Sequence, residues 1–384
     1  MKEERAILWN WNFWSICLTN LCLSCSLYML LPAFPIWMIN MYYASPLEAA
    51  AILAVFGVAI FILGPFFNYI VDRFMRKRVC QFSLLAVCAA TAGFHFVGGL
   101  ETIFWFRILQ GAMFGMAAAT LGSTLAIDLS NSLRRTDANN AYYWFSRFSL
   151  ALGPLCGIFI YQIFGIQVVI TTSIALGLVA YLLISTVKIP FRAPLSPKVC
   201  SFDRFLLVRA MVPFLNLLLI AFLYGLTLTC NMNYEFYGCM MIGFSLALLA
   251  IKYVFKEAEE RSEITAGLIA LTFAMLLRFT HPNNDAAFYL TATLVGLGIG
   301  MSTARFLLYF LKLAEHCERG AANTTYMLAW ELGMAMGYFT GYAMVNYSVT
   351  LLSKVSGVGF IISLMALILY LTVTHKYIIR NKRK

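Results

Sequence analysis

The feature that most constrains this chain is a succession of long apolar segments separated by short polar connections. A transmembrane helix needs about 20 consecutive apolar residues. Charged residues make up only 12% of the chain, against about 25% in a soluble domain. The sequence therefore predicts an all-α membrane protein with twelve transmembrane helices, at 9–38, 46–70, 80–99, 103–128, 140–163, 168–188, 206–229, 237–255, 264–280, 286–311, 322–346 and 355–375.

The first two segments carry local signals of their own. The first is followed by Pro32 to Pro35 instead of a small-residue cleavage site, so we expect it to remain as helix 1. The second opens with Ser45, Pro46 and, after one residue, Glu48. A hydroxyl cap, a proline in the first turn and a carboxylate three residues after the cap predict a helix start at this point.

The distribution of positive charge predicts the orientation of these helices. Lysines and arginines gather at both chain ends and in the even-numbered connections, whereas the opposite connections contain almost only Lys354. Cytoplasmic loops carry the excess of Lys and Arg, so we expect both termini to be cytoplasmic and the helix number to be even. The net charge of +11 then reflects topology and contact with anionic headgroups. No nucleic-acid partner is expected, because the cations do not gather on one soluble face.

Few patterns in the sequence indicate a bound metal, a cofactor or a catalytic site. The ten cysteines lie mostly within apolar segments without metal-ligand spacing, and we expect them to act as small buried hydrophobes. The four histidines are scattered, and no loop of the phosphate-cradling type occurs. We therefore expect no metal, no cofactor and no enzymatic activity, and a multipass membrane enzyme is the less favoured class. No extramembrane region is long enough to serve as a sensor or scaffold domain.

The chain divides into two halves of similar length that look related. A polar linker at 189–205 contains three prolines and separates an N-terminal bundle, 1–188, from a C-terminal bundle with a short basic tail, 206–384. Residues 138–142 (Ala-Asn-Asn-Ala-Tyr) and 322–326 (Ala-Asn-Thr-Thr-Tyr) open the fifth and eleventh segments. We call the separation between Ala138 and Ala322 the repeat offset.

Small residues spaced four apart also correspond at the repeat offset, and this spacing lets helices approach closely. Ser149, Gly153 and Gly157 match Gly333, Gly337 and Gly341. We therefore predict two pseudo-symmetric six-helix bundles.

Two short patterns resemble signatures of the major facilitator superfamily. The basic loop between the second and third segments is similar to the family's Gly-x-x-x-Asp-Arg-x-Gly-Arg-Arg/Lys signature, with Asn68 and Met75 in place of its two glycines. The matching residues are Asp72, Arg73, Arg76 and Lys77. In the fourth segment, Arg107 to Gly111 is similar to the family's Arg-x-x-Gln-Gly signature, and Gln110 provides the glutamine.

The resemblance implies a secondary active transporter that works by alternating access. It also implies that Asp128, at the cytoplasmic end of the fourth helix, pairs with Arg76 in a charge network that includes Asp72 and closes the cytoplasmic gate, beside Arg73 and Lys77. The alternative is that Asp128 is a solvated acid at a helix end.

The fifth segment resembles the Gly-x-x-x-Gly-Pro-x-x-Gly-Gly signature of the family's antiporter branch, which includes multidrug exporters. Gly153, Pro154 and Gly157 match it, whereas Ser149 and Ile158 replace two glycines. Proline removes a backbone donor, and small residues permit close approach, so a helix of this kind can bend and pack tightly. We expect a hinge or packing site here.

Three charged residues within predicted helices are candidates for proton coupling. Glu331 lies about nine residues inside the eleventh helix, or ~14 Å at 1.5 Å per residue. A carboxylate at that depth is costly and by default functional, so Glu331 is the candidate proton carrier, and Arg147 is its repeat mate. The alternative is that Glu331 pairs with a cation of another helix for packing. Arg107 is either a cation that faces the cavity or one that extends to the headgroups, and the nearby Gln110 favours the cavity.

Other polar residues within the membrane are candidates for the substrate cavity, because the resemblance implies that helices 1, 4, 7 and 10 line it. Each of them could instead form a hydrogen bond between helices. The candidates are Asn20, Tyr28, Arg107, Gln110, Asn216, Tyr224 and Arg305.

Taken together, these patterns predict a proton-coupled exporter of a small organic molecule, amphipathic compounds included. Proton-coupled uptake of a nutrient by the same fold is the alternative. We expect a monomer in the plasma (inner) membrane, whose partners are a small-molecule substrate, the proton and anionic lipid headgroups. The sequence leaves open the identity of the substrate, the direction of transport, the coupling ion and its stoichiometry.

Overall fold

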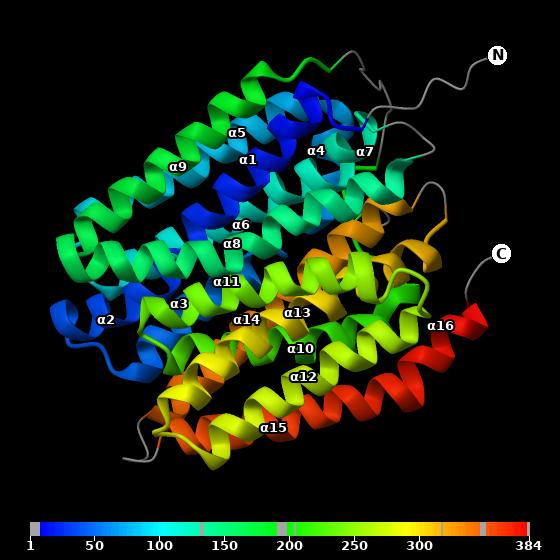
Figure 1. Ribbon diagram of the computed structural model, residues 1–384. Helices are drawn as coiled ribbons and strands as arrows, with labels where there is room; N and C mark the ends of the chain where they lie inside the picture. Colours follow the sequence, from blue (N-terminus) through cyan, green and yellow to red (C-terminus); the bar gives the residue numbers. More distant parts are fainter. Residues whose placement is uncertain are drawn as a thin grey trace.

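The computed structural model describes residues 8–130, 134–189, 198–202, 205–315, 318–345 and 351–381. Throughout this part of the chain the regular secondary structure is helical (Figure 1). The first half contains α1 (Trp11–Tyr28), α2 (Leu30–Tyr42), α3 (Pro46–Ala59), α4 (Gly64–Arg73), α5 (Arg76–Gly93), α6 (Leu100–Thr120), α7 (Ala126–Asp128), α8 (Arg135–Phe164) and α9 (Ile166–Thr186). The second half contains α10 (Met211–Cys230), α11 (Tyr234–Leu249), α12 (Glu260–Thr280), α13 (Asp285–Leu313), α14 (Arg319–Val345), α15 (Leu351–Leu369) and α16 (His375–Asn381).

Short turns of other helix types extend several of these elements. Single π-helical turns join α6 to α7 at Leu121–Leu125, follow α11 at Ala250–Val254 and join α15 to α16 at Tyr370–Thr374. Short 3₁₀ turns follow α5 at Phe94–Phe96 and precede α10 at Val208–Ala210. The joined elements therefore run as long rods across the molecule.

The expectation of an all-helical multipass membrane protein is confirmed. Among the described residues, ten helical rods are long and apolar enough to cross a bilayer, or eleven if the bent pair α3–α4 is one span. The remaining predicted segment corresponds to α14, which is 27 residues long but is not among these candidates. Asn323, Thr324 and Glu331 make α14 polar, and all three side chains are buried in the protein instead of facing lipid. A hydropathy criterion therefore misses a helix that is surrounded by other helices.

Several helices begin before the predicted apolar segments. We predicted starts at 80, 140 and 264, and the helices begin at Arg76, Arg135 and Glu260. The extra first turn carries charged side chains, which a membrane helix can hold only beyond the hydrocarbon region.

Two predicted continuous helices are broken. α1 ends at Tyr28 and α2 begins at Leu30, because Pro32 has no N–H to donate to the carbonyl four residues earlier. α3 and α4 are bent by 46° at a break of four residues, and Pro65 lies in the first turn of α4. The start of α3 is as predicted: the Ser45 hydroxyl accepts from the Glu48 N–H, and the Glu48 carboxylate accepts from the Ser45 N–H.

The helices of each half pack mainly with one another (Figure 1). In the first half α1 packs against α8 and α9, and α5 packs against α6 and α9. In the second half α10 packs against α14 and α15, and α13 packs against α11 and α12. The main contacts between the halves are α3 with α14 and α8 with α11.

Small residues create the closest helix crossings in both halves. A Cβ added to Gly157 on α8 would overlap the Met29 carbonyl oxygen at the break between α1 and α2. A Cβ added to Gly337 on α14 would overlap the Phe222 carbonyl oxygen on α10. Gly153 similarly lies against Tyr28. Gly337 follows Gly153 at the repeat offset, so these two glycines lie at equivalent crossings, each with the first helix of its own half.

Candidate functional site

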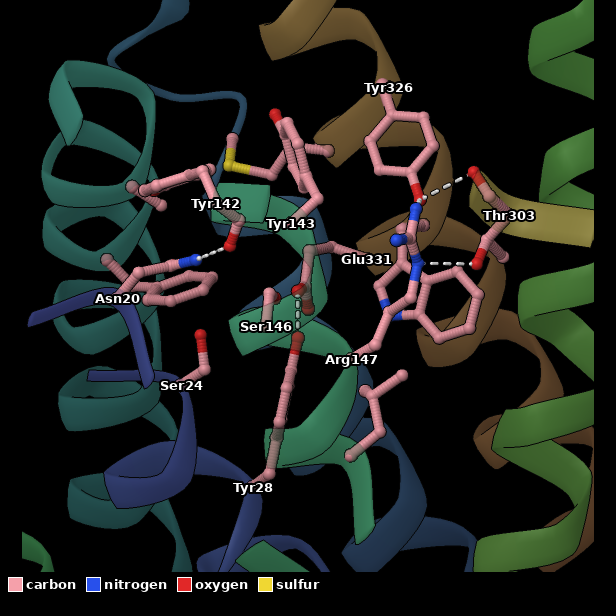
Figure 2. A pocket seen from close by; sticks show the side chains of 15 residues that line it. Asn20, Ser24, Tyr28, Tyr142, Tyr143, Ser146, Arg147, Thr303, Tyr326 and Glu331 are labelled. Carbon is pink, nitrogen blue, oxygen red and sulfur yellow. Dashed lines mark hydrogen bonds between the residues drawn. The ribbon is translucent and has the colours of Figure 1, made fainter. Parts of the chain in front are cut away.

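The central cavity lies between the halves and is lined by α1, α6, α8, α13 and α14 (Figure 2). About 40 Å³ of it can be reached by the centre of a water molecule, and one water needs about 10–15 Å³ on that measure, so the cavity has room for a few waters. The lining residues are Asn20, Ser24, Tyr28, Phe114, Ala118, Tyr142, Tyr143, Ser146, Arg147, Leu150, Thr303, Tyr326, Met327, Trp330 and Glu331.

Glu331 contributes a carboxylate from α14 to this cavity. The side chain is buried, and its Oε1 accepts a hydrogen bond of 2.6 Å from the hydroxyl of Tyr28, which lies at the break between α1 and α2 (Figure 2). Its Oε2 is buried and has no hydrogen-bond partner among the described residues. A buried acid with an unpaired oxygen is costly, and such costs are typically retained at functional sites.

Arg147 contributes a guanidinium from α8 to the same cavity. Its Nε donates to Thr303 Oγ1 at 2.8 Å and its Nη2 to the Tyr326 hydroxyl at 3.5 Å. The guanidinium carbon lies 4.9 Å from the centre of the Trp144 ring. Its Nη1 is buried without a partner among the described residues. Both of these hydrogen bonds run from the first half to the second, so this cation connects the two halves through neutral groups.

These two charges occupy equivalent positions in the repeat, because Glu331 follows Arg147 at the repeat offset. Both are described in full, and they form no ion pair with each other or with another charged side chain of the described residues. For Glu331, the alternative of a packing ion pair with a cation of another helix is therefore not observed in this arrangement.

Of the other predicted cavity residues, two line the central cavity and one lies directly beside it. Asn20 and Tyr28 line the central cavity, and the Asn20 amide donates to the Tyr142 carbonyl at 3.1 Å. Tyr224 is buried beside the cavity residue Trp330, with ring centres 5.8 Å apart, and its hydroxyl donates to the Leu150 carbonyl at 2.7 Å.

Asn216 and Arg305 do not line the cavity in this arrangement. The Asn216 amide donates to the Ala366 carbonyl at 3.1 Å and to Thr374, so it joins α10 to the last predicted span. Arg305 donates through Nε to Glu263 Oε2 at 2.7 Å and joins α13 to α12. For these two residues the observed contacts are the interhelical hydrogen bonds that we considered as the alternative.

Arg107 and Gln110 form a separate polar cluster inside the first half. Arg107 is fully buried, with its guanidinium carbon 4.5 Å from the Phe34 ring centre, so it does not extend to the surface. Its Nη1 donates to Gln110 Oε1 at 2.8 Å, and Gln110 donates to Thr91 at 2.7 Å. The Nε and Nη2 of Arg107 have no partner among the described residues. This is a buried cation surrounded by aromatic rings and neutral groups.

We call the end of the bundle at which α1 begins and α16 ends the terminal end (Figure 1). At this end the residues of the predicted charge network come together. Arg76 forms an ion pair with Asp128, and its Nη2 lies 3.9 Å from Asp72 Oδ1. The Asp72 side chain is buried, whereas Asp128 is partly exposed.

The remaining cations of this loop have other partners. Lys77 donates to the carbonyls of Ser185 and Val187 at the end of α9, at 2.7 and 2.8 Å. Arg73 donates to the Tyr69 hydroxyl at 2.5 Å, one turn earlier on α4. Lys77 therefore fixes the loop to α9 of its own half.

The second half contains an equivalent of this network with the charges inverted. Glu260, at the start of α12, forms an ion pair with Lys312, at the end of α13. These positions follow Arg76 and Asp128 at the repeat offset. One turn deeper, Glu263 pairs with Arg305. The sequence analysis missed Glu260, Glu263 and Lys312, although the offset already seen in the eleventh segment would have identified the first pair.

Asparagines of the repeat connect the halves at the terminal end. The Asn323 amide donates to the Gly122 carbonyl at 3.0 Å and to its repeat mate, Asn139, at 3.3 Å. The Asn323 backbone carbonyl accepts from the Tyr143 hydroxyl at 3.1 Å. One of these bonds borders the central cavity, because Tyr143 also lines it.

Sequence reasoning also missed most of the polar and aromatic lining of the cavity. Ser24 could have been found, because it lies one helical turn from both Asn20 and Tyr28. Tyr142 and Tyr326 could also have been found, because they end the repeated motifs at 138–142 and 322–326, whereas Trp330 gave no such signal among so many aromatic residues. Across the part of the chain that the structure describes, no group of three His, Cys, Asp or Glu side chains could hold a metal ion.

Comparisons with known proteins agree with this architecture. A model of the Major Facilitator Superfamily matches residues 16–258, and no curated protein matches the sequence. The structure is similar to the human organic anion transporter MFSD10 (TETRAN), with a TM-score of 0.71, 15% identity and coverage of 94% of this chain and 98% of that one. It is also similar to a mutant of the peptide transporter POT in complex with alafosfalin, with a TM-score of 0.71, 12% identity and coverage of 97% and 96%.

A mutant of the nucleoside transporter NupG gives a TM-score of 0.67 at 13% identity, with coverage of 95% of this chain and 99% of that one. At such identities these likenesses concern the fold. The family model covers more than half of the sequence, and the fold agrees along nearly its whole length. The chain belongs to the major facilitator superfamily.

Proposed function

We propose that this secondary transporter is a proton-coupled exporter of a small organic molecule, amphipathic compounds included. The observation that carries the proposal is the position of Glu331: a buried carboxylate on the central cavity, bound on one oxygen by Tyr28 and unpartnered on the other among the described residues. A carrier that is driven by protons needs a group that can exchange its proton when the cavity changes sides. Glu331 meets that requirement, because its hydrogen-bond partner is a neutral hydroxyl.

In this proposal the two buried arginines support Glu331. Arg147 lines the same cavity, and its Nη1 can receive an anionic group of a substrate. Arg107 remains a candidate for coupling in another conformation, because a buried cation with two unpartnered nitrogens among the described residues favours the approach of an anion. Asn20 and Tyr28 are the proposed contacts to substrate from α1. Gln110, Tyr224, Asn216 and Arg305 act through interhelical bonds.

The terminal end is the proposed cytoplasmic gate. The ion pairs among Asp72, Arg76 and Asp128 hold α4, α5 and α7 together, and Asn323 bonds α14 to Gly122 in the turn that precedes α7. Opening the gate separates α14 from the first half, with Gly153, Pro154 and Gly157 on α8 as the proposed hinge and packing site. We propose bundles at 1–188 and 206–384, and the packing of most helices within their own half supports this division.

The direction of transport rests on the resemblance of the fifth helix to the antiporter branch. Proton-coupled uptake uses the same fold and remains the second candidate. A transport assay in inverted membrane vesicles with an imposed pH gradient distinguishes export from uptake. Accumulation of substrate in inverted vesicles indicates export. Accumulation only in right-side-out vesicles indicates uptake. The first candidate substrates to test are nucleosides, dipeptides, organic anions and lipophilic amines.

The topology can be tested without a substrate. We propose that both termini face the cytoplasm in a monomer of the plasma (inner) membrane. A cysteine at Asn233 should then react with an impermeant thiol reagent from outside. A cysteine at Ser196, a linker position outside the described residues, should not. The reverse pattern would contradict the orientation.

Glu331→Gln tests the coupling itself. Glutamine keeps the size of the side chain and can accept from Tyr28, but it cannot carry the proton. We expect accumulation driven by a pH gradient to disappear, while exchange of labelled for unlabelled substrate continues. Glu101→Gln, at an exposed acid in the first turn of α6, is the matched control and should behave as the wild type. Normal accumulation by Glu331→Gln would remove Glu331 from the proposal.

A further inference from the structure

The central cavity presents two opposite charges that form no ion pair among the described residues. Glu331 reaches it from the second half and Arg147 from the first, and their side-chain hydrogen bonds are with hydroxyl groups. Each keeps one buried polar atom without a partner among the described residues, Oε2 of the acid and Nη1 of the arginine. Both atoms belong to side chains that line one cavity (Figure 2).

Burying a charge without a partner is unfavourable, and pairing the two residues with each other would relieve both at once. The structure does not do this. Instead, Tyr28 holds the carboxylate, while Thr303 and Tyr326 hold the guanidinium. Because these hydroxyl groups come from different helices, they hold the two opposite charges unpaired on the wall of one cavity.

We infer that the substrate of this cavity is a small zwitterion, whose ammonium group binds Glu331 and whose carboxylate, or an equivalent anionic group, binds Arg147. The inference deepens the proposed function and rests on its assignment of the central cavity as the substrate site. A zwitterion satisfies both unpartnered atoms. An organic anion or an organic cation leaves one of the two charges buried and unpaired.

The surroundings of the two charges fit this assignment. Tyr28 and Trp330 place aromatic rings on the cavity near Glu331, and such rings favour an ammonium group. An arginine can hold a carboxylate through two parallel hydrogen bonds, and Nη1 is available for one of them. The wall of the cavity is also partly apolar, with Phe114, Leu150 and Met327, which suits a short carbon chain.

The test is equilibrium binding to the purified full-length protein in detergent, without a gradient. The probes are ω-amino acids of increasing length, from glycine to 6-aminohexanoate, each with its carboxylate-only and amine-only counterpart, for example hexanoate and hexylamine. We expect one length of zwitterion to bind about tenfold or more tightly than both of its counterparts, because each counterpart loses one charge-assisted pair.

Two variants test which residue binds each end of the zwitterion. With Arg147→Gln the selected zwitterion should bind no better than its amine counterpart, and with Glu331→Gln no better than its carboxylate counterpart. Arg278→Gln, which removes a cation from α12 outside the cavity, should leave the preference unchanged. Size-exclusion profiles and unfolding midpoints establish that each variant is folded, and Arg147→Lys, which keeps the charge, should preserve part of the preference.

Two results would overturn the inference: a carboxylate-only or amine-only probe that binds as tightly as its zwitterion, or no binding by any member of the series to the folded wild type. The proposed function fails in a different experiment. Its failure would appear as unchanged accumulation by Glu331→Gln in vesicles, whereas the zwitterion preference is measured at equilibrium without a proton gradient.

Discussion

Arg76 and Asp128 form an ion pair within the first half of the molecule, and Glu260 and Lys312 form one at the equivalent positions of the second half. The positions are kept and the two signs are exchanged. Because each pair joins helices of one half, exchanging both signs preserves the attraction. The position of the ion pair is therefore shared by the two halves, whereas the sign at each position also depends on the charges beside it, such as Asp72 next to Arg76.

The centre of the molecule uses equivalent positions differently. Arg147 and Glu331 are also related by the repeat offset and carry opposite charges, but they belong to different halves and do not pair. At the terminal end opposite charges satisfy each other, while at the centre they remain available. We propose that this difference separates charges that hold the structure together from charges that bind a substrate or a proton.

The largest expected effect on the transport rate comes from exchanging the signs in the first half. Arg76→Asp with Asp128→Arg should lower the initial transport rate by about tenfold or more, because the new acid lies beside the buried Asp72. Glu260→Lys with Lys312→Glu should keep most of the rate, since the described residues place no third charge in an ion pair with either partner. Rates are measured in vesicles and normalised to the amount of protein. Equal losses in both halves would contradict the comparison.

The next effect distinguishes the two ion pairs of the second half. Glu263→Gln leaves Arg305 without its counter-ion at a largely buried site, and we expect a loss of about 3 kcal/mol in the free energy of unfolding. Glu260→Gln removes a pair whose two side chains are partly exposed, and it should cost less than about 1 kcal/mol. Denaturant unfolding in detergent micelles measures both. A larger loss for Glu260→Gln would reverse this ranking.

Helix crossings should respond alike in the two halves. Gly157→Ala and Gly337→Ala each force a methyl group against a backbone carbonyl, and we expect each to cost about 1–3 kcal/mol of stability. Gly98→Ala, with no atom within 4 Å of the added methyl group, is the control. If only one of the two crossings is sensitive, the halves are not packed equivalently.

The smallest effect concerns the asparagines that join the halves. Asn323→Ala removes donations to Gly122 and Asn139 and should cost about 1 kcal/mol, or roughly a fivefold shift toward the state open at the terminal end. Asn139→Ala removes only the longer bond and should shift the equilibrium less. The rate at which a cysteine at Ser123 reacts with a thiol reagent reports the shift. Slower labelling in Asn323→Ala would mean that the bond does not hold this end closed.

The sequence by itself determined the class of the protein, most of its helices and its repeat. Membrane helices satisfy their backbone within one segment, so long apolar runs predict them without knowledge of their neighbours. The loop and helix signatures identified the family, and the repeat offset identified equivalent positions. Glu331 could be selected because an acid deep in a helix is unusual wherever that helix packs.

Only the tertiary structure decided which polar groups meet. Arg107 and Arg147 look alike as cations within apolar helices, yet one lies in an aromatic cluster and the other on the central cavity. Arg305 pairs with Glu263, while Glu331 meets Tyr28 from the far end of the chain. Helical periodicity shows on which face of its own helix a residue lies. Contacts between helices depend in addition on how each helix is rotated about its axis, on how deep it lies in the bundle and on the break at Met29. These are set by packing across the whole bundle, which no local pattern encodes.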